Sequence, residues 1–326
     1  MIQPRTIFFG GGTPTLLPRD AMQRLIWGLS QIFDLTNVRE WTVEANPATV
    51  DLEYCQMLRQ AGVNRISFGA QSFNPAELAM LERHHDPEDV PRSVQTARNA
   101  GFQRINIDLI FAIPGQSLDS WSRNLELAIS LGTTHLSAYN LTYEPNTPLA
   151  VKKRLGQITA IDENTELEML HHTRARLCQA GLPPYEISNF ASPGQECQHN
   201  LLYWNGMDYI GLGPSAASHV QGHRWKNQAN LGNWESSIEN DQLPIRDLEV
   251  LTPRQRAGEL AMLQLRLAQG LNFSDFEKRT NFNPRQLFAD EIARFSSQRL
   301  LEADDSNLRL THAGIAVADA IAAEFL

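Results

Sequence analysis

The sequence predicts an α/β fold in which parallel strands form a sheet and helices pack on its outside, followed by a smaller α+β domain. From the first residues onward, short apolar runs end in Gly, Asn, Asp or Pro, and an amphipathic stretch follows each run. This β/α alternation is satisfied by an open doubly wound sheet or by a barrel. The alternation stops near residue 247, and helical patterns with a short hairpin follow it.

Six apolar runs are predicted to be strands, at residues 6–9, 41–45, 65–69, 105–111, 135–141 and near 185–188. Helices fill the gaps between them. One is predicted from about 162 to 180, since Asp162 or Asn164 can cap its start and Gly181 follows its end. In both candidate folds the chemistry gathers at the carboxyl ends of the strands, so those residues are the first candidates for a site.

A domain boundary is predicted near residues 230–247, where Gly, Asn, Asp and Pro interrupt the pattern. The chain is therefore divided into residues 1–229 and 230–326. The second part is predicted to hold helices at about 253–269, 274–279 and 284–297, a hairpin at about 300–310 and a final helix. Three helices followed by a hairpin resemble a winged helix. Because acidic and basic residues are mixed in this part without a basic stripe, we interpret it as a packing or interaction module.

The composition argues against several classes of protein. The 326 residues include 37 acidic and 28 basic side chains, and the net charge of −9 makes nucleic acid an unexpected partner. No stretch approaches the roughly 20 apolar residues of a membrane span, and the start lacks the pattern of a signal peptide. Three widely spaced cysteines, Cys55, Cys178 and Cys197, favour a reducing compartment over a disulfide framework. We therefore expect a cytoplasmic protein without a membrane span.

Small or polar residues lie at the ends of five successive predicted strands. The first strand runs into GGGTPT at 10–15, whose glycines would let a ligand touch the backbone, although three glycines taken alone are more often a tight strand exit than a binding site. This segment matches no dinucleotide or triphosphate loop. Glu44 and Gln71 end the next two strands, Asp108 lies within the fourth, and the fifth leads into the polar segment 140–148. Together these positions predict a cofactor pocket, with a structural hydrogen bond as the alternative role of Asp108.

The segments GGGTPT, EANP, RISFGAQS, IDLIFAIPGQ and LSAYNLTYEPNTPL, in that order, resemble the radical S-adenosylmethionine (SAM) superfamily, and within it the oxygen-independent coproporphyrinogen III oxidase branch. The segment YEISNFA at 185–191, followed by HNLLYW at 199–204, resembles the HNxxYW motif of the HemW heme chaperones of that branch. The likeness covers about residues 5–222, with a fainter likeness to the branch's C-terminal domain afterwards. It implies a partial (β/α)6 TIM-like radical SAM barrel missing its first βα unit, plus a C-terminal winged-helix-like α+β domain.

The resemblance assigns SAM to most of the residues at these strand ends, which together form the rim of the sheet. The set is Gly11, Gly12, Thr13, Glu44, Gln71, Arg83, Asp108 and Thr142. The glycines and the threonine after the first strand would meet the methionyl amine and carboxylate. The four longer polar side chains would hold the methionyl, ribose and sulfonium parts, and the segment around Thr142 would lie along the adenine.

The HNxxYW motif implies a heme contact. His199 would face the iron, since a neutral imidazole is the usual axial ligand, and Tyr203 and Trp204 would pack on the porphyrin plane. A histidine that merely ties a loop together is the alternative. Cys197 is a second candidate for the iron, and no residue is assigned a catalytic role.

The superfamily holds a 4Fe-4S cluster with a CxxxCxxC motif, which this sequence does not contain. The three cysteines belong to distant segments and are not expected to converge on one cluster. The resemblance therefore implies that the chain as written does not cleave SAM and binds it more weakly. We expect an upstream start codon to restore the motif, with genuine loss of the redox half as the alternative.

The resemblance implies two functions. The leading hypothesis is a HemW-type heme chaperone that binds heme, and SAM as a second ligand, and transfers heme to apo-proteins. The alternative is an oxygen-independent coproporphyrinogen III oxidase, which needs the cluster for radical SAM decarboxylation in porphyrin biosynthesis. A scaffold that binds neither ligand is a third class. The expected partners are heme or porphyrin and heme-accepting apo-proteins, and a dimer is compatible with each hypothesis.

Overall fold

The computed structural model describes residues 2–145 and 147–326, and the chain divides into two compact units, Met1–His199 and Asn200–Leu326. The strands of the first unit are β1 (Thr6–Phe9), β2 (Glu40–Ala45), β3 (Arg65–Gln71), β4 (Arg104–Phe111), β5 (His135–Asn140) and β6 (Asn189–Ala191). Its helices are η1 (Pro14–Leu16), α1 (Arg19–Ile32), α2 (Leu52–Gln60), α3 (Pro75–Met80), α4 (Asp89–Asn99), α5 (Leu118–Ser130), α6 (Pro148–Arg154) and α7 (Glu163–Gln179). Helix α8 (Gln198–Trp204) begins at the end of this unit.

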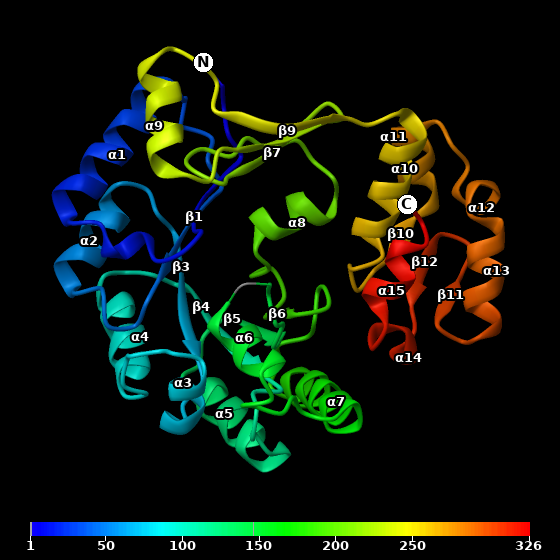
Figure 1. Ribbon diagram of the computed structural model, residues 1–326, viewed down its shortest axis with the longest axis horizontal. Coiled ribbons are helices and arrows are strands. Elements are labelled where there is room, and N and C mark those ends of the chain that lie inside the picture. Colours follow the sequence, from blue (N-terminus) through cyan, green and yellow to red (C-terminus); the bar gives the residue numbers. More distant parts are fainter. Residues whose placement is uncertain (1, 146) are drawn as a thin grey trace. The chain divides into compact units, whose positions relative to one another are not determined.

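The six strands form one sheet in the order β1-β2-β3-β4-β5-β6 (Figure 1). The first five strands run parallel, and β6 pairs antiparallel with β5. The predicted α/β fold with a parallel sheet is therefore confirmed, and the first five predicted strands lie within two residues of the observed bounds. The sixth was placed too early. Residues 185–188 form a turn in which Glu186 accepts hydrogen bonds from the Ser188 N–H and the Asn189 side chain, and the strand follows it.

The two faces of this sheet differ in chemistry because side chains alternate along each strand. The outward face is apolar and lies in the core beneath the surrounding helices; on β2 to β5 it consists of Trp41, Val43, Ala45, Ile66, Phe68, Ala70, Ile105, Ile107, Leu109, Leu136 and Ala138. The inward face is mostly polar; beside Gly69 and Ile110, it carries on β2 to β5 the side chains of Glu40, Thr42, Glu44, Arg65, Ser67, Gln71, Asn106, Asp108, His135, Ser137 and Tyr139. Polar side chains therefore gather on one face of the sheet, while the helices pack against the other.

Helix α7 illustrates how the local sequence sets the element bounds. The Asp162 side chain accepts a hydrogen bond from the Thr165 N–H, which caps the helix start as expected. The helix ends just before Gly181, which has φ of +79°, a conformation that glycine adopts without strain.

A buried carboxylate joins the end of β3 to α5. Glu77 is 5% exposed and accepts hydrogen bonds from four neutral donors. The donors are the hydroxyls of Ser72 (2.6 Å) and Ser120 (2.5 Å) and the side-chain amides of Gln116 (2.9 Å) and Asn124 (2.8 Å). These bonds satisfy the carboxylate without a cation. Because they also join residues from both sides of the loop that follows Gln71, the network holds this loop in place.

We expect Glu77→Ala to lower the free energy of unfolding by about 3 kcal/mol, because it leaves several buried donors without an acceptor. Urea unfolding measures this change through the shift in midpoint. The control is Glu168→Ala on the exposed face of α7, which should change stability by less than about 0.5 kcal/mol. A Glu77→Ala chain as stable as this control would contradict the structural role of the network.

The second unit contains two small sheets. The strands β7 (Ala217–Val220), β8 (His223–Asn227) and β9 (Ile245–Val250) form an antiparallel sheet, with α9 (Leu231–Glu239) between β8 and β9 in the sequence. The remaining elements are α10 (Pro253–Gln264), β10 (Leu271–Asn272), α11 (Phe273–Thr280), α12 (Pro284–Leu287), α13 (Ala289–Ser297), β11 (Leu301–Ala303), β12 (Asn307–Leu310), α14 (His312–Ile315) and α15 (Ala318–Ala323). The second sheet has the order β10-β12-β11 and shares a separate apolar core with the helices around it.

Three details of this part of the chain differ from the sequence prediction. The interrupted stretch 230–247 contains α9, which Asn230 caps by accepting a hydrogen bond from the Asn233 N–H. The predicted helix 284–297 is divided at Phe288 into α12 and α13. The predicted division at 229/230 falls between β8 and β9, which pair with each other, whereas the compact units divide between His199 and Asn200. Within the described residues, no helix combines the length and apolar character needed to cross a membrane.

Candidate functional site

The glycine turn after β1 lies against the carboxylate of Glu44. A Cβ atom at Gly10 would be 2.5 Å from the Phe8 ring and 2.9 Å from a Glu44 carboxylate oxygen, so no larger residue fits there. Gly11 and Gly12 have φ of +85° and +146°, which favour glycine. The Gly11 N–H also donates to the Glu44 carboxylate. The first two predicted rim segments therefore form one surface.

Two carboxyl groups of this rim have raised pKa values. Burial, together with the nearby Asp108 carboxylate, raises the pKa of Glu44 to about 7. Burial also raises the pKa of Asp108, although Ser67 and Asn106 each donate a hydrogen bond of 2.8 Å to it. Within the described residues neither carboxyl group forms an ion pair with Lys or Arg. The pair therefore favours a ligand that brings a positive charge.

Gln71 lies next to these groups in an uncommon backbone conformation. Its φ is +63°, and a register shift between Gly69 and Gln71 leaves Gly69 paired with Asp108. A Cβ at Gly69 would lie 2.8 Å from the Gln71 side-chain nitrogen, so the Gln71 amide covers Gly69. Gln71 therefore lies beside the strand position that pairs with Asp108.

Three of the predicted SAM residues are less closely joined to this rim. Thr13 is half-buried and its carbonyl accepts a hydrogen bond from the Leu16 N–H in η1. Arg83 and Thr142 are exposed, and within residues 2–145 and 147–326 they share no hydrogen bond or ion pair with the other predicted residues. Their contact with SAM remains a prediction.

A buried polar network below the rim was missed by the sequence analysis. His135 is 1% exposed; its Nδ1 lies 2.6 Å from Asn106 Oδ1 and its Nε2 lies 2.9 Å from the Tyr185 hydroxyl. Burial holds the pKa of His135 well below its usual range, so the ring is neutral. The sequence feature that could have revealed this network is the alternation of polar residues within β2, β3, β4 and β5. The apolar residues between them obscured this alternation.

His199 lies in the first turn of α8 with its ring held on two sides. Its Nδ1 is 2.8 Å from the Thr6 hydroxyl, and the ring stacks on Phe8 with centroids 5.0 Å apart and planes 19° apart. Burial lowers the pKa of His199 to about 4, despite the opposing effect of Glu40. The imidazole is therefore neutral at physiological pH, which is the form that binds metals.

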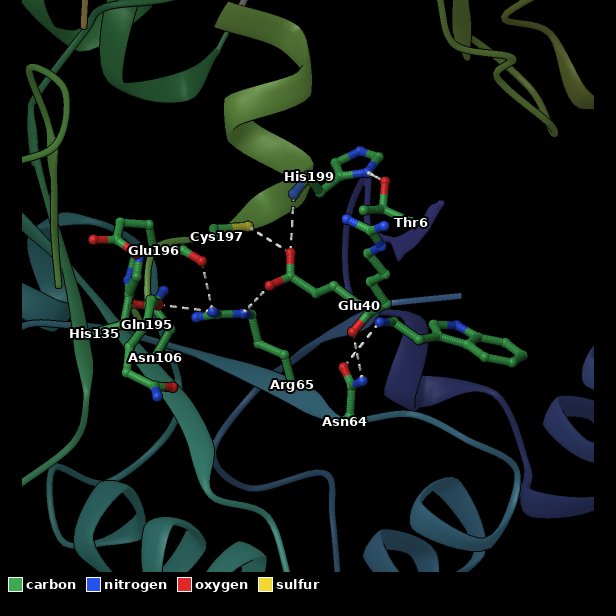
Figure 2. Close-up of polar contacts among 12 residues, drawn as sticks. Thr6, Glu40, Asn64, Arg65, Asn106, His135, Gln195, Glu196, Cys197 and His199 are labelled. Carbon is green, nitrogen blue, oxygen red and sulfur yellow. Dashed lines mark hydrogen bonds and ion pairs between the residues drawn. The ribbon is translucent and has the colours of Figure 1, made fainter. Parts of the chain in front are cut away.

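A buried ion pair holds the segment that carries His199 (Figure 2). Arg65 Nε donates to Glu40 Oε2 at 2.9 Å, and the two side chains are 2% and 0% exposed. Arg65 Nη2 donates to the carbonyls of residues 195–196 at 2.8 and 3.1 Å. Glu40 Oε1 accepts from the His199 N–H at 2.9 Å and from the Cys197 thiol at 3.3 Å. The sequence analysis did not identify either charged residue as part of a site.

The two aromatic residues of the HNLLYW segment belong to the second unit. The Tyr203 ring contacts the Tyr209 ring edge-on at 4.4 Å, and the Arg266 guanidinium lies 4.9 Å from the Trp204 ring. Both rings are half-buried in these contacts. Their packing on a porphyrin remains a prediction.

The three cysteines lie on different elements and do not converge. Cys55 is buried in α2 and Cys178 is exposed in α7, while Cys197 precedes α8 and donates to Glu40. Burial raises the pKa of the Cys55 thiol to about 12, far above the range in which a thiolate ligand forms. Across the described residues, no group of three or more His, Cys, Asp and Glu side chains is arranged to hold a metal. The cysteines of this sequence therefore do not fit a 4Fe-4S cluster.

Comparisons with known proteins identify the family. Residues 2–128 match the Radical SAM superfamily, and residues 251–317 match the HemN C-terminal domain. The heme chaperone HemW of Lactococcus lactis is 32% identical over 322 residues, which are 99% of this chain and 84% of that protein. The chain belongs to the HemW family. The resemblance predicted from the sequence is confirmed.

Two further HemW proteins and one solved structure are also similar to this chain. The heme chaperone HemW of Bacillus subtilis is 32% identical over 99% of this chain and 85% of its own length. The heme chaperone HemW of Escherichia coli is 41% identical over 66% of this chain and 56% of its own length. The coproporphyrinogen III oxidase HemN of Escherichia coli, described as a radical SAM enzyme, has a TM-score of 0.86 at 24% identity, over 99% of this chain and 78% of that one. HemN therefore shares the fold of this HemW-family chain.

Proposed function

We propose that this protein is a heme chaperone that binds heme through His199 and transfers it to apo-proteins. The observation that carries the proposal is the state of His199, the first residue of HNLLYW, whose neutral ring is stacked on Phe8 and held at Nδ1 by Thr6. A ring held at Nδ1 directs Nε2 toward a metal in a fixed orientation. The similar HemW proteins of Lactococcus lactis and Bacillus subtilis are heme chaperones by name, which supports heme as the cargo.

SAM is the second proposed ligand, at the rim formed by the glycine turn, Glu44, Gln71 and Asp108. The residues fit it because two carboxyl groups without a described cationic partner suit its ammonium and sulfonium charges, and the glycines admit a ligand to the backbone. When bound, SAM would supply an adenosyl group and a sulfonium cation. Because the cysteines of this sequence do not fit the cluster, no radical step is part of the proposal. Likeness to HemN shows a fold and does not assign an oxidase activity.

Titration with hemin tests the proposal. We expect a Soret shift that saturates in the original chain, and His199→Ala should raise the dissociation constant for hemin about tenfold or more because it removes the iron ligand. The matched control is His84→Ala, which removes an exposed histidine outside the site. The heme-loaded chain should also deliver heme to a heme-free b-type hemoprotein, followed by the absorbance of the acceptor. A His199→Ala chain that binds hemin as tightly as the control would overturn the assignment of His199.

A further inference from the structure

Three adjacent strands each supply one side chain to the segment that carries His199. Thr6 of β1 contacts the ring, Glu40 of β2 holds the His199 N–H, and Arg65 of β3 holds the carbonyls of residues 195–196 (Figure 2). These strands are paired in register, with Thr6 opposite Glu40. The position of the segment is therefore set by the sheet and not by α8 alone.

The buried ion pair between Glu40 and Arg65 is better explained by its effect on the orientation of this segment than by a contribution to the stability of the fold. Removing two charges from water costs about as much as their attraction returns, so a buried pair contributes little net stability. Besides the bond between them, the side chains of Glu40 and Arg65 make four hydrogen bonds within the described residues, and all four go to residues 195–199. Two are donated to backbone carbonyls, one is accepted from a backbone N–H, and one is accepted from the Cys197 thiol. The pair therefore acts as a clamp on the backbone next to His199.

The contact with Thr6 sets the chemical state of the ring once a metal is bound. If Nε2 binds iron, the remaining proton of the neutral imidazole lies on Nδ1 and is donated to the Thr6 hydroxyl oxygen, 2.8 Å away. Such a hydrogen bond fixes the ring orientation and makes the ligand more basic. Thr6 is half-buried, so water competes only weakly for this proton.

We propose that Thr6, Glu40 and Arg65 are positioning residues that orient the His199 imidazole toward heme iron. This proposal rests on the proposed function, since it gives these residues a role only if His199 binds heme. Neither Glu40 nor Arg65 touches the heme iron in this scheme. Their effect passes through the backbone of residues 195–199.

Thr6→Val and Arg65→Lys test the proposal in the full chain. Valine matches threonine in shape but removes the hydroxyl, and lysine keeps the charge beside Glu40 but lacks the planar fork that reaches the carbonyls. We expect each variant to raise the dissociation constant for hemin about 10- to 100-fold. In the ferrous form, Thr6→Val should also lower the Fe–His stretching frequency measured by resonance Raman spectroscopy, because the ligand loses its hydrogen bond. A purely structural role would not move this frequency.

Matched controls carry the same substitutions outside the clamp. Thr42→Val replaces a buried threonine of β2 whose hydroxyl has no hydrogen-bond partner among residues 2–145 and 147–326. Arg59→Lys replaces an arginine that donates to the Val63 carbonyl at 2.6 Å. Both should bind hemin like the original chain and give its Raman spectrum.

The outcomes separate this proposal from the proposed function. If the original chain shows no Soret change that depends on His199, the proposed function fails. If His199→Ala loses hemin but Thr6→Val keeps both the affinity and the Fe–His frequency, the positioning role is overturned while the function stands. Should Arg65→Lys fail to fold, Thr6→Val decides, because its substitution preserves shape and removes no charge.

Discussion

Replacing Arg65 with methionine is expected to lower the free energy of unfolding of the first compact unit by about 3–5 kcal/mol. Methionine fills the space of the arginine stem but leaves the Glu40 carboxylate buried without its cation, at 0% exposure. The carbonyls of residues 195–196 also lose their donor. Hydrogen exchange of the β2 and β3 amides, measured across a urea series, reports the loss in this unit separately from the rest of the chain.

A second substitution distinguishes the effect of the unpaired buried charge from the effect of the lost side-chain volume. In Glu40→Gln, Arg65→Met the side chain at position 40 still offers an oxygen to the His199 N–H but carries no charge. This double variant should therefore be more stable than Arg65→Met alone. If both are equally destabilised, the cost arises from packing, and the buried charge is not its cause.

The affinity for SAM is expected to fall about fivefold between about pH 7.4 and about pH 6.0. The pKa of Glu44 is raised from 4.5 to about 7, so its carboxylate is ionised above pH 7 and becomes protonated as the pH falls through that value. The protonated form attracts the methionyl ammonium less. Since an α-amino group itself loses its proton near pH 7.7–8.0, roughly, the affinity should pass through a maximum between about pH 7 and 8. Equilibrium dialysis with radiolabelled SAM measures the profile.

Glu44→Gln should remove the acid limb of this profile and keep the alkaline limb, because the amide does not titrate in this range. At pH 8 the same change should weaken binding about tenfold, since a charged hydrogen bond is replaced by a neutral one. Glu168→Gln, on the exposed face of α7, serves as the control and should leave the profile unchanged. An acid limb that persists in Glu44→Gln would assign it to another group, with Asp108 the nearest candidate.

The sequence was informative where local rules decide the structure. Parallel strands, the capped helix α7 and the glycine turn follow from periodicity and turn chemistry, and the placement of Glu44 and Gln71 near the carboxyl ends of their strands follows from the strand pattern. The motif likeness then identified the family. Strand β6 was misplaced because a turn held by Glu186 resembles a short apolar run in composition.

The clamp around His199 was not predictable by the same rules. Glu40 and Arg65 each open a strand, where they look like solvated charges. Only the pairing of β2 with β3 brings their side chains into contact, and the segment that Arg65 holds lies about 130 residues further along the chain. The contact between Thr6 and His199 spans 193 positions. Such pairings depend on tertiary folding, which no local pattern encodes.

If Gln71 contacts SAM as proposed, its left-handed backbone makes protein stability and ligand binding compete at one residue. A non-glycine residue at φ of +63° costs on the order of 1 kcal/mol, and the Ser72–Glu77 network beside it keeps the backbone in place. Glycine at this position would relieve the strain but would remove the amide that covers Gly69. Directed evolution for heat resistance alone would therefore drift toward glycine here, whereas selection that also demands the adenosyl ligand would retain glutamine and tolerate the lower melting temperature.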